Sequence, residues 1–255
     1  MKIKKILYRS GFSLTRIAKD SNAPIELNQE ENRIIHYVRA NNLSMCSTQN
    51  LQQTAIACKY IALNDIPGDF VECGVMKGGN ALIAAKVFEI YNVDKKVYLF
   101  DTFTGMSAPT KYDIKTSSKS VALDKYLLRK RSGFTDWAYA PLEEVKENFR
   151  KLNLLTDNVV FVKGKVEDTL DQLKNIPTAI SFLRLDTDFY ESTKMELDKL
   201  YEKLVKGGIL VIDDYGAFDG ARKAVDEFFK KFPTPPFLSL IDNSARIAVK
   251  VTENK

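Results

Sequence analysis

The stretch GGILVIDDYG, residues 207–216, contains the pattern from which the fold follows. Its apolar run, residues 209–212, is typical of a strand buried on both faces, and two adjacent carboxylates, Asp213 and Asp214, come directly after it. Two like charges this close are unfavourable unless a cation, a proton or a hydrogen-bond donor compensates them. The end of this strand is therefore a candidate ligand site.

Strands and helices alternate on both sides of this stretch. Short apolar runs predict strands over residues 69–75, 95–101, 158–164, 179–186 and 207–214. Helical patterns follow them over residues 80–91, 141–152, 166–173, 190–204 and 221–232. Two further helices, 26–40 and 47–64, precede the first strand, and Ser47 is the expected N-cap of the second. This order predicts an α/β fold with a mostly parallel sheet, right-handed crossovers and helices on both faces.

The C-terminal end of the chain departs from this alternation. Residues 237–241 and 245–251 form two predicted strands joined by a turn so short that they must run antiparallel. A parallel sheet that ends in an antiparallel hairpin is the outline of the Rossmann-like class I S-adenosylmethionine (SAM) methyltransferases, whereas an NAD-binding sheet normally stays parallel. We therefore expect a helical extension or cap over residues 1–64 and a SAM methyltransferase domain over residues 65–255, interrupted by an irregular polar insertion at about 104–140.

Composition narrows the range of functions. The 255-residue chain has a net charge of +5 and 45% hydrophobic residues, which is typical of a globular protein. His36 is the single histidine, so catalysis by a histidine triad and metal sites with several histidines are excluded. Three cysteines without metal-ligand spacing predict a reducing, cytoplasmic setting. No apolar run approaches the roughly 20 residues of a membrane-spanning helix. Residues 1–19 carry basic but no acidic side chains, which suits either a solvated extension or an arm for an anionic partner.

Acidic side chains close the strands along one edge of the predicted sheet. They are Glu72, Asp101, Asp168, Asp186, Asp213 and Asp214. Ligands of open α/β sheets bind beyond the carboxyl ends of the strands, so these acids should face one crevice.

The turn after the first strand, ECGVMKGGN, is the expected cofactor loop. Its glycines, Gly74, Gly78 and Gly79, lack the G-x-G-x-x-G spacing that cradles a pyrophosphate, but they suit a ligand without one, such as SAM. Asp101, one βα unit later, can accept hydrogen bonds from a ribose diol. The alternatives are a tight strand-to-helix turn for the glycines and a helix N-cap for Asp101.

Three of the carboxylates are expected to converge, because Asp186 ends the strand next to the one that ends at Asp213 and Asp214. Oxygen ligands of this kind suit Mg²⁺, Ca²⁺ or Mn²⁺, and zinc is not expected because neither a histidine nor a cysteine is nearby. The alternative is that one aspartate caps the following helix while the other is solvated.

With these residues in place, the chain resembles the TylF-type (macrocin) O-methyltransferases, SAM- and Mg²⁺-dependent enzymes that methylate sugar hydroxyls of macrolide and aminocoumarin antibiotics. The matching stretches include GDFVECGVMKGGNALI, YLFDTFTGM, VKGKVEDTL and LRLDTDFYESTKMELDKLYEKLVKGGILVIDDYG, and the match extends from about residue 43 to 230. The resemblance implies that Asp186, Asp213 and Asp214 bind the metal and that Asp186 is also the catalytic base. The SAM-binding positions that it implies are Met45, Ser47, Glu72, Gly74, Gly78, Gly79, Asp101, Thr102, Phe103, Lys165, Val166 and Asp168.

The insertion at about 104–140 does not match closely, and the resemblance implies that it forms a lid over the acceptor. Its basic side chains outnumber its acidic ones, and it contributes several aromatic rings. The insertion is therefore either a lid that accepts an anionic sugar or an ordinary solvated lid with no preference for the charge of the acceptor.

The expected function is SAM- and Mg²⁺-dependent O-methylation of one hydroxyl of a vicinal diol on a glycosylated or nucleotide-linked small molecule. The alternatives are methylation of another small diol, such as a catechol, and a SAM-binding protein without catalysis. A nucleic-acid substrate is not expected, because DTDFY, residues 186–190, lacks the prolines of the amino-methylating signature. The oligomeric state stays open, with a homo-oligomer among the alternatives.

Overall fold

The computed structural model describes residues 23–252, apart from residues 173 and 175, so the basic stretch over residues 1–19 lies outside the described residues. The strands are β1 Asp69–Cys73, β2 Val97–Asp101, β3 Val159–Lys163, β4 Ile180–Leu185, β5 Leu204–Ile212, β6 Ser239–Leu240 and β7 Arg246–Val249. The helices are α2 Gln29–Ala40, α3 Thr48–Leu63, α4 Gly79–Ile90, α5 Ala122–Arg129, α6 Leu142–Lys151, α7 Val166–Thr169, α8 Tyr190–Leu200, the 3₁₀ helix η2 Tyr201–Lys203, and α9 Asp219–Phe229.

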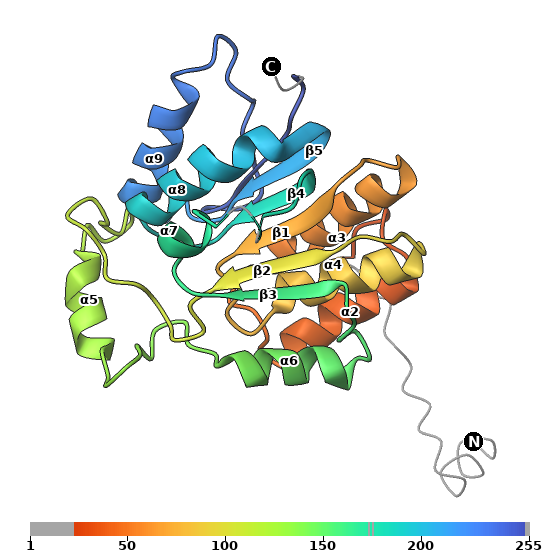
Figure 1. Ribbon diagram of the computed structural model, residues 1–255, viewed down its shortest axis with the longest axis horizontal. Coiled ribbons are helices and arrows are strands. Elements are labelled where there is room, and N and C mark those ends of the chain that lie inside the picture. Colours follow the sequence, from red (N-terminus) through yellow and green to blue (C-terminus); the bar gives the residue numbers. More distant parts are fainter. Residues whose placement is uncertain (1–22, 173, 175, 253–255) are drawn as a thin grey trace, which may run out of the picture.

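The strands form one seven-stranded sheet in the order β3-β2-β1-β4-β5-β7-β6 (Figure 1). The pairs from β3 to β5 are parallel, and β7 runs antiparallel to both β5 and β6. This arrangement confirms the predicted parallel sheet with its C-terminal antiparallel hairpin.

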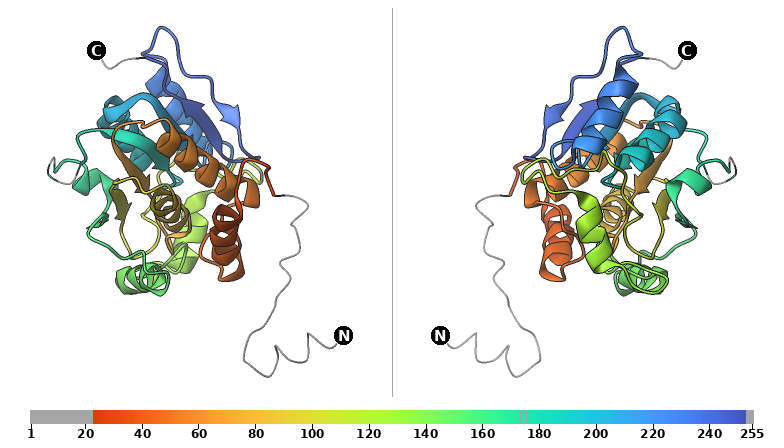
Figure 2. Two further views of the ribbon diagram at one scale, coloured as in Figure 1. Left: turned by 90° about the vertical axis from the view of Figure 1, so that its right-hand side faces the viewer. Right: turned by 90° about the vertical axis from the view of Figure 1, so that its left-hand side faces the viewer.

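Helices cover both faces of the sheet, as expected (Figures 1 and 2). One hydrophobic core joins α2, α3, α4 and α6 to one face, with Phe70 and Phe182 in contact at its centre. A second core joins α7, α8 and α9 to the other face. The division into a cap over residues 1–64 and a methyltransferase domain over residues 65–255 stays a prediction. No helix in the described part of the chain is both long enough and apolar enough to cross a membrane.

The two N-terminal helices begin at side-chain caps. Ser47 accepts a hydrogen bond from the backbone N–H of Asn50, which confirms the predicted N-cap of α3. Asn28 and Glu31 form a capping box, so α2 begins at Gln29, three residues later than the sequence pattern indicates.

Two elements differ from the sequence-based expectation. The strand β5 begins at Leu204 rather than Gly207, because the chain bulges between Leu204 and Ile209, which pair with Ile180 and Phe182. The insertion at 104–140, expected to be irregular, contains α5, a helix of only eight residues whose three leucines, Leu123, Leu127 and Leu128, are exposed. Helix α5 lies apart from the sheet in Figure 1.

Candidate active site

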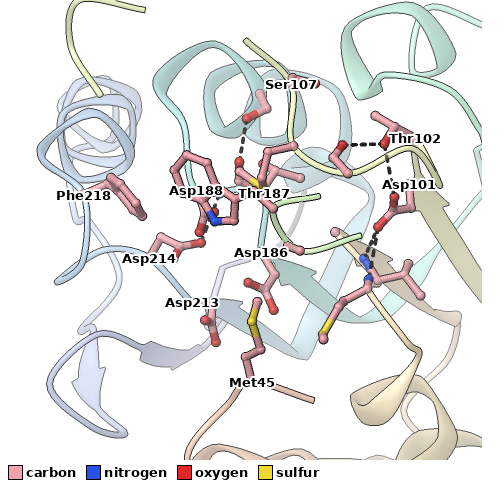
Figure 3. A pocket seen from close by; sticks show the side chains of 18 of the residues that line it. Met45, Asp101, Thr102, Ser107, Asp186, Thr187, Asp188, Asp213, Asp214 and Phe218 are labelled. Atoms are coloured by element: carbon pink, nitrogen blue, oxygen red, sulfur yellow. Dashed lines mark hydrogen bonds between the residues drawn. The ribbon is translucent and has the colours of Figure 1, made fainter. Parts of the chain in front are cut away.

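A cavity of about 980 Å³ opens at the carboxyl ends of the parallel strands, between the sheet and the insertion (Figure 3). Most of the residues expected at the site line this cavity: Met45, Glu72, Gly74, Gly79, Asp101, Thr102, Lys165, Val166, Asp186, Asp213 and Asp214. The fold therefore brings together residues from segments that are far apart in the sequence.

The remaining four expected residues lie outside the cavity lining. Ser47 caps α3 and donates a hydrogen bond to Asp242 at 2.5 Å. Gly78 precedes α4 in a left-handed conformation, and Phe103 is buried in the core. Asp168 is exposed on α7, while its neighbour Glu167 lines the cavity instead.

Gly74 brings the ends of two strands into close contact. Its φ of +84° is costly for any residue with a Cβ, and a Cβ at this position would lie 1.8 Å from the carbonyl oxygen of Asp186. A glycine is therefore required where the turn after β1 passes the end of β4, directly beside one of the expected metal ligands.

Asp101 holds the cofactor loop through its side chain. One oxygen accepts hydrogen bonds from the backbone N–H groups of Val75 at 2.7 Å and Met76 at 3.1 Å. The other accepts from the N–H of Phe103 at 2.7 Å. The carboxylate thus ties the turn after β1 to the turn after β2, and its contact with a ribose stays a prediction.

The adjacent aspartates of the opening stretch project from opposite faces of the sheet. Side chains alternate along a strand, so Asp213 shares a face with Val211, and Asp214 shares the other with Ile212. Asp213 accepts a hydrogen bond from Asn50 at 2.7 Å, whereas Asp214 accepts one from the backbone N–H of Asp188 at 3.1 Å. Figure 3 shows the two side chains pointing apart. The repulsion between neighbouring carboxylates is therefore reduced by their geometry before any cation is considered.

Arg184, which the sequence analysis did not single out, lies at the centre of the acidic residues. Its side chain is fully buried and contacts three carboxylates, those of Glu72 at 3.2 Å, Asp186 at 2.6 Å and Asp213 at 2.6 Å. Burial lowers the pKa of the guanidinium, but Asp213 and Asp186 raise it well above its ordinary value. The sequence does contain a signal for this role, because an arginine inside an apolar strand is expected to be buried and therefore paired with an acid.

A second group of carboxylates lies on the other side of Asp186. Ligand oxygens of Asp186, Asp188 and Asp214 lie within 4.8 Å of one another. Burial raises the pKa of Asp186 and of Asp214 well above the usual range, and it raises the pKa of Asp188 to about 7. Asp188 was also missed by the sequence analysis, although it lies two residues after Asp186. Of these three side chains only Asp186 contacts Arg184, so together they form an anionic pocket that favours a proton or a cation.

Glu72 and Cys46 also line the cavity beside these carboxylates. Burial raises the pKa of Glu72 to about 8, and its Oε2 atom has no hydrogen-bond partner in the described structure. Burial also raises the pKa of the Cys46 thiol, and Cys46 accepts a hydrogen bond from Arg184 at 3.1 Å. The thiol is therefore not activated as a nucleophile.

The strand order, the glycine turn after β1 and the acidic residues at the ends of β2, β4 and β5 define a class I SAM-dependent methyltransferase. A family model described as macrocin O-methyltransferase (TylF) matches residues 13–247, and the chain belongs to that family of SAM-dependent O-methyltransferases.

Relatives with assigned activities agree with this identification. The chain is 32% identical over 208 residues to the demethyldecarbamoylnovobiocin O-methyltransferase of Streptomyces niveus, covering 80% of this chain and 74% of the relative. It is 31% identical over 204 residues to the 8-demethyl-8-(2,3-dimethoxy-alpha-L-rhamnosyl)-tetracenomycin-C 4'-O-methyltransferase of Streptomyces olivaceus, covering 79% and 73%. The solved structure of the O-methyltransferase NovP superposes with a TM-score of 0.70 at 29% identity, covering 82% of each chain. The protein is an enzyme that transfers methyl groups to oxygen.

Proposed function

We propose that the protein transfers the methyl group of SAM to one hydroxyl of a vicinal diol on a sugar-linked small molecule, with Mg²⁺ or a similar hard cation in the acidic pocket. The observation that carries this proposal is the convergence of carboxylates from β4 and β5 beside the glycine turn, in one cavity. The name of one relative supports a sugar-linked acceptor, since its substrate is a tetracenomycin that bears a rhamnosyl group.

The carboxylates of this pocket fit a hard divalent cation. Arg184 occupies one oxygen of Asp186 and one of Asp213, and the other oxygen of each makes no hydrogen bond within the described residues. Asp214 and Asp188 add further oxygens beside Asp186. The family resemblance implies Asp186, Asp213 and Asp214 as the ligands, whereas the structure groups Asp186 with Asp188 and Asp214, and separately with Cys46 and Asp213. We propose that Asp186 and Asp214 hold the cation, with the free oxygen of Asp213 as the third ligand and Asp188 as an additional acid in reach. Carboxylates are the ligands that Mg²⁺ prefers, and a bound divalent ion lowers the pKa of a hydroxyl that it contacts.

The chain's own residues supply the rest of the reaction. We propose that the glycine turn, held by Asp101, binds SAM so that its methyl group faces Asp186. Methyl transfer from sulfur to oxygen is an in-line displacement, so its rate depends on how closely the hydroxyl oxygen is positioned opposite the sulfur. Asp186 is the proposed base that takes the hydroxyl proton, as the family resemblance implies, and a cation bound beside it would keep its carboxylate ionised.

Variants of the acidic residues test the proposal. We expect Asp186→Asn to lower kcat by about 10²–10⁴-fold, the usual contribution of a general base. Asp214→Asn should weaken Mg²⁺ binding in calorimetry, a measurement that needs no acceptor. The matched control is Asp157→Asn, an exposed aspartate far from the cavity lining. Wild-type activity that survives both EDTA treatment and Asp186→Asn would refute the proposed chemistry.

An acceptor panel separates the sugar from other diols. Purified enzyme with SAM is supplied in parallel with glycosides bearing vicinal hydroxyls and with catechol. Methylation of catechol alone would replace the sugar acceptor by an aromatic diol.

We also propose a cytoplasmic location, which is supported by the three unpaired thiols, Cys46, Cys58 and Cys73.

A further inference from the structure

The basic side chains of the insertion fall into two groups in the structure. Lys115, Lys125 and Arg129 line the cavity. Lys119 and Arg131 do not, and they pair with Asp219 at 2.9 Å and Asp136 at 2.5 Å. Lys111 and Lys130 also lie outside the cavity lining, so three of the seven basic side chains of this segment face the cavity.

The carboxylates of the insertion do not neutralise the two cavity lysines. Asp113 is fully buried and accepts hydrogen bonds from Thr110 and from the backbone N–H of Tyr190, which anchors the insertion to α8. Asp136 is engaged by Arg131, with Arg129 at 3.6 Å. In the part of the chain that the structure describes, Lys115 and Lys125 have no carboxylate within ion-pair distance.

Both lysines are held in place by packed structure rather than by a free loop. The Lys125 ammonium lies 3.9 Å from the centre of the Trp137 ring. Trp137 is buried and packs edge-on against Phe189, which directly follows Asp188. The backbone at Lys115 pairs with Phe218, in the loop that follows β5. The lysines therefore project from two different segments that are fixed to the acid-lined part of the cavity.

The positive charges are close enough to affect one another. Burial lowers the pKa of Lys125, and Lys115 and Arg129 lower it further, while Asp188 raises it. Asp188 is the acidic group that offsets this repulsion at Lys125, and no carboxylate forms an ion pair with either lysine within the described residues, so the gathered positive charges favour an anionic ligand among them. The cavity thus has a cationic wall on the insertion and an anionic pocket at the strand ends. Its volume lies at the upper end of the roughly 300–1,000 Å³ of ligand pockets, which leaves room for an acceptor beside a cofactor.

We infer that the acceptor carries an oxyanion, a phosphate or a carboxylate, which binds Lys115 and Lys125 while its sugar hydroxyls face the acidic pocket. This inference rests on the proposed function and specifies its acceptor as an anionic sugar. Arg129 contributes less than the lysines because its guanidinium is shared with Asp136.

The first test measures anion binding without methyl transfer. Protein saturated with S-adenosylhomocysteine in EDTA, which removes metal as a competing phosphate ligand, is titrated with inorganic pyrophosphate in a calorimeter. We expect saturable binding that weakens by at least about tenfold in the K115Q/K125Q double variant, since each lysine contributes a charged hydrogen bond. Both side chains are exposed, so folding should be unaffected. Lys130→Gln removes the same charge from the same segment outside the cavity lining and should change the Kd less than twofold. Absence of saturable binding, or equal weakening in Lys130→Gln, would overturn the inference.

The second test compares acceptors that differ only in charge. A set of free hexoses and their 1-phosphates is offered with SAM and Mg²⁺. We expect a higher kcat/KM for the phosphorylated member of the accepted pair, and a loss of this preference, mainly through KM, in K115Q/K125Q. Equal turnover of the two members by the wild type would overturn the inference while leaving sugar methylation intact. Failure of every sugar, with pyrophosphate still bound, would instead refute the proposed function.

Discussion

Arg184 provides the sharpest test of how the acidic site is held together. Replacing it by methionine keeps most of the side-chain volume but removes the only cation that contacts Glu72, Asp186 and Asp213 among the described residues. Above its pKa of about 8, Glu72 carries a charge that water cannot compensate, because the side chain is 2% exposed, whereas the other two carboxylates are 22% and 16% exposed. Removing one partner of a buried ion pair typically costs about 3–5 kcal/mol.

The assay for Arg184→Met is urea unfolding at about pH 9, where Glu72 is ionised because its pKa is about 8, followed by circular dichroism with a thermal scan beside it. A loss of about 3–5 kcal/mol corresponds to a fall in Tm of roughly 6–20 °C for a chain of this size. The control is Arg150→Met, since Arg150 is an exposed arginine paired with Glu147 one turn earlier on α6, and an exposed pair contributes at most about 1 kcal/mol.

A second variant isolates the cause of this destabilisation. Adding Glu72→Gln to Arg184→Met removes the uncompensated charge and should recover part of the lost stability, whereas Glu72→Gln alone should not stabilise the protein. A double-mutant cycle measures this coupling between the two residues. If Arg184→Met loses no more stability than Arg150→Met, or if the added Glu72→Gln recovers nothing, the reasoning about a buried charge centre is refuted.

Three further predictions concern the same cavity. Gly74→Ala should destabilise the protein by about 1–3 kcal/mol more than Gly133→Ala in chemical unfolding, because both positions have a positive φ but only the Cβ at Gly74 would clash, with the Asp186 carbonyl; equal losses would contradict this. Asp101→Asn should weaken binding of S-adenosylhomocysteine by about tenfold or more in calorimetry, since an amide cannot accept from all of the backbone N–H groups that hold the cofactor loop; an unchanged Kd would argue against this role. The free energy of unfolding of the wild type should fall as the pH rises from about 4.5 to about 8, because Glu72 keeps its proton in the folded protein but has lost it in the unfolded chain. Unfolding measured at several pH values should show a flatter dependence for Glu72→Gln.

Much of the fold can be predicted from the sequence because its signals are local. Apolar runs of strand length alternate with helical patterns, and the short turn at residues 242–244 forces the final hairpin, so the sheet follows from features within each segment. The insertion is the exception. Helix α5 has only eight residues, too few for a hydrophobic period to be recognised, and its leucines are exposed rather than packed in a core.

The place of the site can also be predicted, because parallel strands end at the same edge of a sheet. Chain order alone brings Asp101, Asp186 and the pair Asp213–Asp214 to that edge, and Gly74 to the turn beside them. The acidic residues predict a bound cation, and the glycine predicts a cofactor that lies close to the backbone. Both predictions follow from the residue types alone.

The contacts among these residues are decided only by the tertiary structure. Asp213 meets Arg184 because β4 and β5 pair with Arg184 opposite Val211, and the alternation of side chains sends Asp214 to the other face, toward Asp188. In the same way, packing of the insertion against α8 and the loop that follows β5 separates the lysines that face the cavity from those already paired. Periodicity records which residues are buried, but the register between strands and the packing of distant segments determine which charges meet.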